Sequence, residues 1–432
     1  MATTDSTDAR RRRVWIVNHY ADAPDRASGT RHFDLARRLV AAGDDVTIFA
    51  SGFSHVTGRE ERLRRWQLYR RQTFDGVRFV WLRTTPYRGN GGRRQLNMLS
   101  FVVSFLIVQW RVARPDVIVG STVHPFAAWS AWLASVLRRA DFAYEIRDLW
   151  PQTLVDMGAM RVGSLGERVL RRIEGSLVRR ASVVIALLPG VADYLRGRGL
   201  PADHVLYVPN GVDLAAFDTA SAAEPGRPSA AATAIALARG LETDGRVVFA
   251  YVGAFGLVND LGTIVEAARM AEIRSPGAVG LLLIGDGPER TAIERRIDGL
   301  PGIAIAAPVP KANVPAVLAA VDVGLVHATA TPVYRYGISF NKLFEYFAAR
   351  RPVVFACTSS YDPVALTGAG ATVPPSDADA MATAMVDLAT RSVAERDAMG
   401  ASGRAYVENA HDIARLAERL AGADGLGRAR RR

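Results

Sequence analysis

Short apolar runs rich in β-branched residues alternate with longer helical patterns along the whole chain. The segment 30–42 illustrates the helical pattern, because Phe33, Leu35 and Leu39 recur at the spacing of one helix face and Gly43 follows in the position of a C-cap. Such alternation is typical of βαβ units that wind around parallel sheets. The sequence therefore predicts an α/β fold.

The expected strands form two series separated by a turn signal at residues 209–211. A segment rich in Ala, Ser, Pro and Gly follows at residues 220–238, and we expect its first part to be a loop and its last part a helix. The first series comprises 14–18, 46–50, 77–82, 117–120, 142–146, 183–187 and 205–208, and the second 247–252, 281–284, 303–306, 323–326 and 353–356. We therefore predict two α/β domains, residues 1–208 and 209–400, followed by a last helix at 401–420.

The charge of the chain is unevenly distributed. It carries 54 Lys and Arg against 43 Asp and Glu, a net charge of +11. Residues 1–215 hold 32 Arg and 20 acidic residues, whereas residues 216–432 are nearly balanced, with 22 Lys and Arg against 23 acidic residues. A basic half favours an anionic partner such as a nucleic acid, a phospholipid surface or a phosphorylated acceptor, and it is equally compatible with a solvated face that serves solubility.

Residues that usually hold metals are few and scattered. The only cysteine, Cys357, excludes an internal disulfide and a cysteine-based zinc site, and none of the seven histidines has metal-ligand spacing. Asp377 and Asp379 have the spacing of an Asp-x-Asp metal motif, but they also begin a helical pattern at 378–389, where acidic residues cap a helix. We therefore expect no metal centre.

The longest apolar stretch runs from residue 96 to residue 110 and is shorter than the roughly 20 residues that a membrane-spanning helix needs. Two interpretations are open: a buried helix, or a helix at a membrane interface, since Arg93, Arg94, Arg111 and Arg114 flank it. No secretory signal is recognisable. We therefore expect a cytoplasmic protein, with peripheral contact with an anionic membrane under the second interpretation.

The most specific pattern is Tyr-Gly-Ile-Ser-Phe-Asn-Lys-Leu-Phe-Glu at residues 336–345. A loop enters a helix near Ser339, whose N–H groups and dipole favour a phosphate, and Lys342 and Glu345 lie one turn apart on one face. A cation for phosphate and a carboxylate for ribose hydroxyls make a nucleotide-binding pair; the alternative is a surface ion pair between the two. A lysine is informative here, because Lys311 is the only other one in the chain.

Two strands of the second series run into glycine-containing turns. Gly253 and Gly256 follow the first of them, where backbone N–H groups can reach an anion. Gly285 and Gly287 follow the next strand, but Arg290 stands where a dinucleotide fingerprint has its third glycine. The sequence therefore argues against a nicotinamide or flavin site, while a ligand can still approach these turns closely.

Three loops of the first half are expected at the carboxyl edge of its sheet, where ligands bind in such folds. Arg147 and Asp148 end one strand, His124 follows another, and Gly29 and Thr30 lie where the first strand's loop enters its helix. These five residues are therefore candidates for substrate binding, although His124 could equally be structural.

Taken together, these motifs resemble a retaining glycosyltransferase of the GT-B fold, family 4, over nearly the whole chain. The motifs that carry the resemblance are the loop around Gly29, residues 209–213, 251–253 and 285–288, and the helix with Glu345. Residues 147–151 and 336–345 resemble a bacterial subgroup that builds O-antigen or capsular polysaccharide, including transferases of N-acetyl-fucosamine-type sugars.

The resemblance implies two Rossmann-like domains that face a central cleft, with the last helix crossing back onto the first domain. It implies a nucleotide sugar, UDP-linked, in the C-terminal domain and a lipid-linked or saccharide acceptor in the N-terminal domain, with no metal. The donor-binding residues that it implies are Gly253, Gly256, Gly285, Gly337, Ile338, Ser339, Asn341, Lys342 and Glu345. The acceptor side would include Gly29, Thr30 and His124.

Two departures from the family pattern concern the donor. Many members carry two glutamates eight positions apart; Glu345 matches the second, but the first falls on Gly337. Backbone amides of Gly337 and Ile338 could take over its contacts with the donor sugar. The phosphate-binding Arg or Lys that some members keep after the first glycine turn is absent from residues 254–260.

The mechanism that the resemblance implies is front-face displacement, in which the leaving nucleotide diphosphate helps to deprotonate the acceptor. Lys342 would stabilise that leaving group, Glu345 would hold the ribose, and Asp148 with Arg147 would position the acceptor or the sugar hydroxyls. Two alternatives share the fold: a nucleotide-sugar epimerase and a catalytically silent nucleotide-binding subunit. We do not expect nucleic-acid binding, since neither a recognised module nor aromatic stacking platforms are apparent.

Overall fold

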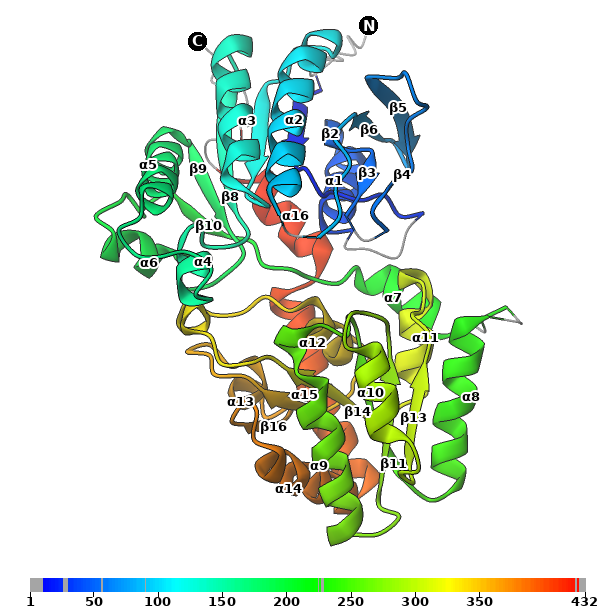
Figure 1. The fold of residues 1–432 in the computed structure, drawn as a ribbon. Coiled ribbons are helices and arrows are strands. Elements are labelled where there is room, and N and C mark those ends of the chain that lie inside the picture. The colour runs from blue at the N-terminus through cyan, green and yellow to red at the C-terminus, as the bar shows by residue number, and fades with distance from the viewer. Residues whose placement is uncertain are drawn as a thin grey trace, which may run out of the picture.

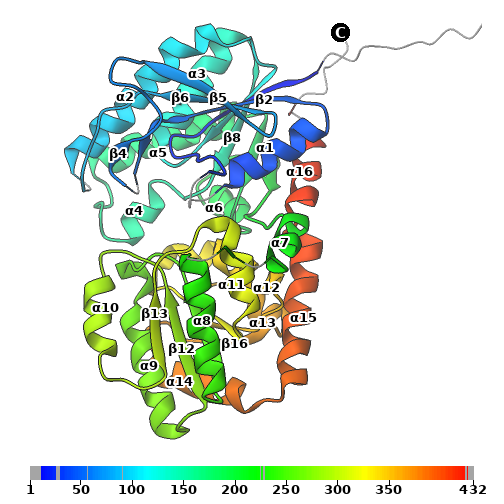
Figure 2. The same ribbon diagram turned by 90° about the vertical axis from the view of Figure 1, so that its right-hand side faces the viewer.

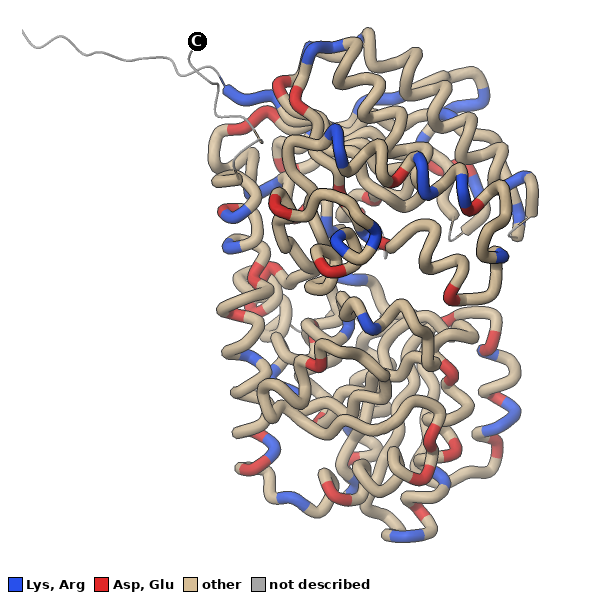
Figure 3. Tube along the Cα trace, turned by 90° about the vertical axis from the view of Figure 1, so that its left-hand side faces the viewer, with Lys and Arg blue, Asp and Glu red and all other residues tan. Residues whose placement is uncertain are grey.

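The computed structural model describes residues 11–25, 30–55, 57–89, 91–223, 225–226, 229–423 and 426. They form an N-terminal and a C-terminal α/β lobe stacked along the long axis of the molecule (Figure 1). Each lobe contains one largely parallel sheet with helices on both faces. The two doubly wound sheets confirm the predicted fold class. Basic and acidic positions are interspersed on both lobes (Figure 3).

The N-terminal sheet has the strand order β10-β9-β8-β7-β1-β2-β6-β5, and only β5 runs antiparallel to its neighbour. The expected strands form because their continuous apolar runs are buried on both faces. β5 is absent from the prediction, since its exposed Arg70 and Arg71 interrupt any apolar pattern, and it joins β6 through Asp75 and Gly76, both with positive φ. The strands are β1 Arg13–Val17, β2 Asp45–Ser51, β5 Tyr69–Phe74, β6 Val77–Leu82, β7 Val117–Ser121, β8 Asp141–Ile146, β9 Val183–Ala186 and β10 Val205–Tyr207, with the short pair β3 Phe53–Ser54 and β4 Arg59–Glu60 beside them.

The C-terminal sheet is parallel throughout, in the order β13-β12-β11-β14-β15-β16. Its edge strand β16 is not among the predicted strands, because it is short and only partly buried. The strands are β11 Val247–Val252, β12 Val279–Ile284, β13 Ile303–Ala306, β14 Val323–His327, β15 Val353–Ala356 and β16 Gly370–Val373.

Helices cover both faces of each sheet. In the N-terminal lobe, α1 (Arg31–Ala41) lies on one face, and α2 (Gly92–Val108), α3 (Pro125–Arg138), α5 (Leu165–Arg180) and α6 (Val191–Gly197) pack on the other. In the C-terminal lobe, α9 (Leu261–Arg274) and α14 (Ala378–Thr390) share a core on one face. The remaining helices are α4 Gln152–Asp156, α7 Leu214–Ser221, α8 Ala230–Thr243, α10 Arg290–Ile297, α11 Val314–Ala319, α12 Asn341–Ala348, α13 Pro363–Thr367, α15 Val393–Ala410 and α16 Ile413–Ala421, with the 3-10 turns η1 Gln109–Arg111, η2 Leu257–Asn259, η3 Lys311–Asn313 and η4 Pro332–Tyr336.

The predicted last helix at 401–420 is broken into α15 and α16. The break occurs because the Asp412 carboxylate accepts a hydrogen bond from the Ala414 N–H as the cap of a new helix, and because Asp412 forms a bridge with Val212. α15 packs on α12 in the C-terminal lobe, and α16 packs on α1 in the N-terminal lobe. The two helices run in succession along one side of the molecule (Figure 2).

The junction between the lobes is built around Asn210. Its N–H donates to the Ser339 hydroxyl at 2.9 Å, its side-chain amide donates to the Ser339 carbonyl at 2.6 Å, and its own carbonyl lies 2.8 Å from Nδ1 of His411. The next residue must be glycine, because a Cβ on Gly211 would lie 2.2 Å from the His411 carbonyl oxygen. The chain therefore passes between the lobes in tight contact with both α12 and α16.

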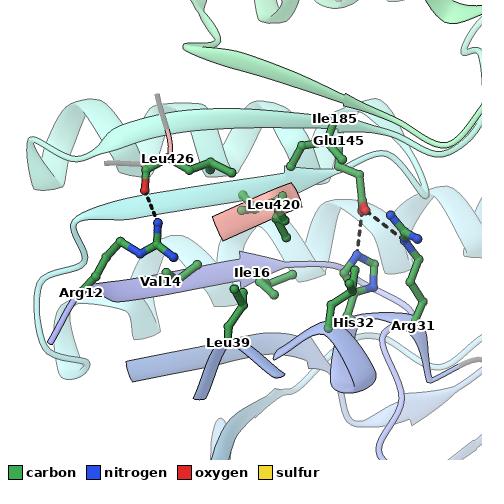
Figure 4. A pocket seen from close by; sticks show the side chains of 12 residues that line it. Arg12, Val14, Ile16, Arg31, His32, Leu39, Glu145, Ile185, Leu420 and Leu426 are labelled. Carbon is green, nitrogen blue, oxygen red and sulfur yellow. Dashed lines mark hydrogen bonds and ion pairs between the residues drawn. The ribbon is translucent and has the colours of Figure 1, made fainter. Parts of the chain in front are cut away.

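A buried ion cluster lies beneath α1, beside a small apolar cavity that Leu420 of α16 also lines (Figure 4). The Glu145 carboxylate accepts from Arg31 and from Nε2 of His32, at 3.3 and 2.7 Å. Burial disfavours the charge on Glu145, but His32 and Arg31 hold the pKa of its carboxyl well below the usual range. Arg31 also donates to the Val208 carbonyl at 2.6 Å and to the Pro209 carbonyl, so the cluster fixes the entry to the junction.

Five buried histidines should make folding stability depend on pH. Burial lowers the pKa of His19, His32 and His327, that of His124 to about 3 and that of His411 to about 4. In the unfolded chain they bind protons near pH 6.5, so the unfolded state takes up more protons than the folded state below that pH. We expect the free energy of unfolding to fall as the pH drops below about 6.5, by up to about 1.4 kcal/mol per pH unit for each histidine.

Urea unfolding at several pH values between 8 and 5 measures this dependence. The variant His124→Asn keeps a side chain that can cap α3. It should reduce the proton uptake on unfolding by about one proton, and the free energy of unfolding should then depend less steeply on pH. A free energy of unfolding that stays constant from pH 8 to pH 5 would contradict the expectation.

Candidate active site

A cavity of about 260 Å³ lies between the lobes. Arg147 and Asp148 line it from the N-terminal lobe, and Gly337, Ile338 and Ser339 line it from the C-terminal lobe. The two groups come from loops that follow β8 and η4 and are far apart in the sequence. The structure thus brings the predicted catalytic pair to the same cavity as three of the predicted donor-binding residues.

Asp148 reaches the cavity because it lies two residues beyond the end of β8. Its side chain is open to the cavity, and the protein around it raises the pKa of the carboxyl by desolvation, an effect that Arg147 partly offsets. Within the described part of the chain, no side chain donates a hydrogen bond to this carboxylate. It is therefore available to accept hydrogen bonds from hydroxyl groups of a bound molecule.

The loop before α12 touches the N-terminal lobe through two glycines. The Gly190 N–H donates to the Tyr336 carbonyl at 2.9 Å, and a Cβ on Gly190 would lie 2.8 Å from that oxygen. Gly337 has φ of +98°, and a Cβ there would lie 2.5 Å from the Pro189 ring. A glutamate at position 337 would therefore be strained in its backbone and would collide with the facing lobe.

The helix α12 begins at Asn341, two residues later than the start near Ser339 that the sequence suggests. Ser339 instead binds Asn210 at the junction, and no side chain caps the N-terminus of α12. The N–H groups of its first turn, including that of Asn341, carry the positive end of the helix dipole.

Lys342 reaches from α12 to the turn after β11. Its Nζ donates to the Tyr251 hydroxyl at 2.8 Å and to the Asn259 side-chain oxygen at 3.3 Å, and it lies 4.1 Å from the centre of the Tyr251 ring. A Cβ on Gly253 would lie 3.2 Å from this nitrogen, so the ammonium adjoins the glycine turn. Burial lowers the pKa of Lys342 to about 7. Both hydrogen-bond partners are neutral, and no described carboxylate forms an ion pair with this half-buried ammonium.

Glu345 forms an ion pair with Lys311, whose η3 turn precedes α11. The alternative ion pair between Lys342 and Glu345 is therefore wrong, since each side chain has another partner. The ion pair uses Oε1 of Glu345 and leaves Oε2 for another donor. Both lysines of this arginine-rich chain thus lie in the predicted donor region.

The glycine turns after β11 and β12 pack against each other backbone to backbone. A Cβ on Gly285 would lie 1.9 Å from the Gly253 carbonyl oxygen, and one on Gly287 would lie 2.5 Å from the Phe255 carbonyl oxygen. Gly256 is different, because the nearest atom to its added Cβ would be 3.7 Å away. Gly253, Gly285 and Gly287 therefore hold the two turns together, and Gly256 leaves the surface beside η2 open.

The three predicted acceptor residues differ in their positions and contacts. Gly29 lies outside the described residues, and the Thr30 hydroxyl donates to Asp34 at 2.6 Å just before α1. His124 caps α3, where its Nδ1 accepts from the Ala127 N–H at 3.2 Å and its Nε2 lies 2.8 Å from Nδ1 of His19. Both ring nitrogens are thus occupied, and an acceptor could bind His124 only by displacing one of these partners.

Asp377 caps α14 by accepting from the Ala380 N–H at 2.9 Å, which confirms its capping role. Among the described residues, no three His, Cys, Asp or Glu side chains are grouped so that they could hold a metal ion. Over the same residues, every helix is too short or too polar to cross a bilayer.

Two family descriptions match the sequence. Residues 27–211 match a "Glycosyl transferase 4-like domain", and residues 246–391 match "Glycosyl transferases group 1". No curated protein matches the sequence.

Several solved structures share the fold over almost the whole chain. The sucrose-phosphate synthase of Thermosynechococcus elongatus is 20% identical with a TM-score of 0.69, covering 95% of this chain and 98% of that one. Anabaena HepE in complex with UDP and glucose is 15% identical with a TM-score of 0.63 and the same coverage. A UDP-forming α,α-trehalose-phosphate synthase from Burkholderia xenovorans is 15% identical with a TM-score of 0.69, covering 96% of this chain and 98% of that one.

This chain belongs to the GT-B glycosyltransferases. Its two matched segments correspond to the two lobes, and the cavity lies between them.

Three residues that hold the site of this glycosyltransferase together were not among the predicted site residues. Tyr251 and Asn259 hold Lys342, and Lys311 holds Glu345. The rarity of lysine already distinguished Lys311, but its partner lies 34 positions away on another element. His19, which contacts the predicted residue His124, was also not predicted, although it directly follows the strand predicted at 14–18.

The two glycines that meet across the cleft can be tested in the glycosyltransferase. We expect Gly190→Ala and Gly337→Ala to push the lobes apart, and Gly337→Ala to lose a further amount of about 1–2 kcal/mol of stability from its positive φ. Small-angle scattering and urea unfolding measure the two effects. Gly197→Ala is the matched control, because no atom lies within 4 Å of its added Cβ. Scattering curves identical to that of the unsubstituted protein would contradict the close approach.

Proposed function

We propose that the glycosyltransferase moves a sugar from a UDP-linked donor to a lipid-linked or saccharide acceptor, with retention of configuration, in the synthesis of a cell-surface polysaccharide of the O-antigen or capsule type. The observation that carries the donor assignment is Lys342, a half-buried ammonium with neutral partners beside a glycine turn and an uncapped helix. A partly desolvated cation is destabilised without a negative charge nearby, and a nucleotide diphosphate would supply one. The UDP bound to Anabaena HepE, which shares this fold, supports the choice of nucleotide.

The donor would lie along the carboxyl edge of the C-terminal sheet. Its diphosphate would bind Lys342, the Gly253–Gly256 turn and the α12 N-terminus with Asn341, and its ribose hydroxyls would donate to Oε2 of Glu345. The sugar would then reach the cavity beside the backbone of Gly337 and Ile338, where the family's first glutamate cannot stand.

The acceptor would enter from the N-terminal lobe, through the loop of Gly29 and Thr30 and past the edge where His124 lies. In the transfer step, the bond between the sugar's anomeric carbon and the diphosphate oxygen breaks. The acceptor oxygen bonds the same face of that carbon, and its proton passes to the departing diphosphate. Lys342 stabilises the charge that develops on the leaving group, while Asp148 and Arg147 orient hydroxyl groups. No step calls for a metal or a protein nucleophile.

The donor proposal is tested by thermal unfolding with UDP, GDP, dTDP and NAD. A nucleotide at about one hundred times its dissociation constant should add about 2.7 kcal/mol to the free energy of unfolding. We expect UDP to stabilise the protein, and Lys342→Met and Glu345→Gln to reduce the effect. An absence of stabilisation by every nucleoside diphosphate would overturn the proposal and favour a silent subunit.

The pKa of Lys342 gives UDP binding a specific pH dependence. A bound diphosphate favours the ammonium, so binding above pH 7 requires the protein to take up a proton. Affinity for UDP should therefore fall by about tenfold per pH unit between pH 7.5 and 9. Lys342→Arg stays charged throughout and should bind with nearly constant affinity. Calorimetry in buffers of different ionisation enthalpy measures the proton uptake directly, and zero uptake at pH 8.5 would refute this role.

Asp148 is tested by Asp148→Asn, which keeps the shape and removes the charge. We expect turnover with a lipid-linked acceptor to fall by about tenfold or more, with stabilisation by UDP unchanged, because the carboxylate lies on the acceptor side of the cavity. Asp193→Asn, at an exposed ion pair with Arg196, is the matched control. Unchanged turnover in Asp148→Asn would remove this residue from the mechanism, and sugar modification without any acceptor would favour an epimerase.

A further inference from the structure

The outward face of α2 and the turn after it is apolar. Leu96, Leu99, Val103, Ile107 and Trp110 recur every three or four residues, and each is between 47% and 57% exposed. Surface helices ordinarily place charged residues on this side, yet residues 95–110 contain none. The exposed apolar row therefore needs an explanation other than packing within the lobe.

Packing of the lobe uses the opposite side of the same helix. Asn97, Phe101, Phe105 and Val108 are buried against the sheet and α3. The interpretation as a buried helix is thus confirmed for this side, and the opposite side of the helix is exposed.

The end of α3 extends this apolar surface. Val136 and Leu137 are 57% and 48% exposed, and Arg138 stacks on Trp110 with its guanidinium carbon 5.0 Å from the ring centre. α2 and α3 lie side by side on the same face of the lobe (Figure 1). We call the exposed residues Leu96, Leu99, Val103, Ile107, Trp110, Val136 and Leu137 the α2–α3 face.

The charges around the α2–α3 face are almost all positive. Residues 91–140 contain six arginines and one acidic residue, Asp116, which accepts from the Arg13 N–H at 2.8 Å. The arginines are Arg93 and Arg94 before α2, Arg111 and Arg114 after it, and Arg138 and Arg139 at the end of α3. A hydrophobic face bordered at both ends by arginines is complementary to a surface that is apolar inside and negatively charged outside.

We propose that the α2–α3 face docks onto an anionic lipid bilayer. The apolar side chains enter the acyl boundary, Trp110 lies at the headgroup level and the arginines contact lipid phosphates. A second copy of the chain fits this face less well, because a symmetric contact would bring the same arginines against one another. The docking itself is inferred from the exposed side chains and charges. Only its biological role, which is to bring the acceptor-binding lobe to lipid-linked acceptors, rests on the proposed function.

The topology gives the docked molecule an orientation. α2 follows β6, which is parallel to β8, so α2 begins at the carboxyl edge where Asp148 lines the cavity. It ends at the opposite edge, since β7 follows it. The face therefore runs from the cleft outward along the lobe, and a membrane that covers it lies next to the cleft.

Flotation of the full-length protein with phosphatidylglycerol vesicles and with phosphatidylcholine vesicles tests the proposal. We expect binding to the anionic vesicles, weakened by high salt, and a loss of about tenfold or more in Val103→Glu/Ile107→Glu. Ile273→Glu is the matched control, since Ile273 is an exposed apolar residue of α9 in the other lobe. Arg93→Ala/Arg111→Ala should weaken binding by about fivefold for each arginine removed.

Three outcomes would overturn the proposal: no binding of the unsubstituted protein to anionic vesicles, equal binding by Val103→Glu/Ile107→Glu, or a dimer in solution that the same pair dissociates while vesicles bind nothing. Stabilisation by UDP, measured on every variant, separates this inference from the proposed function. If the unsubstituted protein fails to bind vesicles but is still stabilised by UDP, the membrane face alone is rejected; the pair variant is expected to lose vesicle binding and to keep its UDP response.

Discussion

The arrangement of the two lobes depends on one buried arginine. Arg31 sits at the start of α1, is nearly inaccessible to solvent, and divides its guanidinium between Glu145 and the carbonyls of Val208 and Pro209. A charge buried this deeply persists only when its donors are satisfied. The cluster therefore fixes together the first helix, a central strand and the point where the chain leaves the lobe. Asn210 then connects this cluster to the C-terminal lobe, since it forms hydrogen bonds with Ser339 before α12 and with His411 at the end of α15.

The two sides of the cleft are consequently built by different means. On the N-terminal side, side chains such as Asp148 project from strand ends into the cavity. On the C-terminal side, glycines bring backbone close to backbone, as at Gly285 and Gly253, and leave Lys342 as the cation that faces the turn. The Arg or Lys that some family members keep in this loop is absent from residues 254–260, and a lysine from α12 occupies the adjacent space. A helix-borne cation that reaches back to the turn does electrostatically what a loop-borne one would do.

The central strands were predictable because a strand that is buried on both faces has a continuous apolar sequence. This sequence can be recognised without knowing which strands pair with it. β5 and β16 escaped prediction for the opposite reason, since edge strands are partly solvated and their pairing depends on neighbours. The two glycine turns and Lys342 were likewise visible in sequence, because they follow strand ends or begin a helix. The partners of these side chains could not be predicted from the sequence. Lys311 contacts Glu345, and His19 contacts His124, which lies 105 positions away, because the topology of the fold brings them together.

The segment at residues 96–110 shows why periodicity alone left two interpretations open. A helix that is apolar all around has no polar side to indicate which side is buried, so a core helix and an interfacial helix give the same pattern. The buried and exposed sides of the helix can be distinguished only in the folded lobe, where Phe101 and Phe105 are buried against the sheet and Val103 and Ile107 are exposed. Part of the basic excess of residues 1–215 lies around that outer face. Six of the arginines border the face, and residues 95–110, which form most of it, contain no charged residue. In the proposed docking, apolar contact and anionic attraction act on one surface of the N-terminal lobe, and the C-terminal lobe, with balanced charge, is left to the proposed nucleotide-sugar donor.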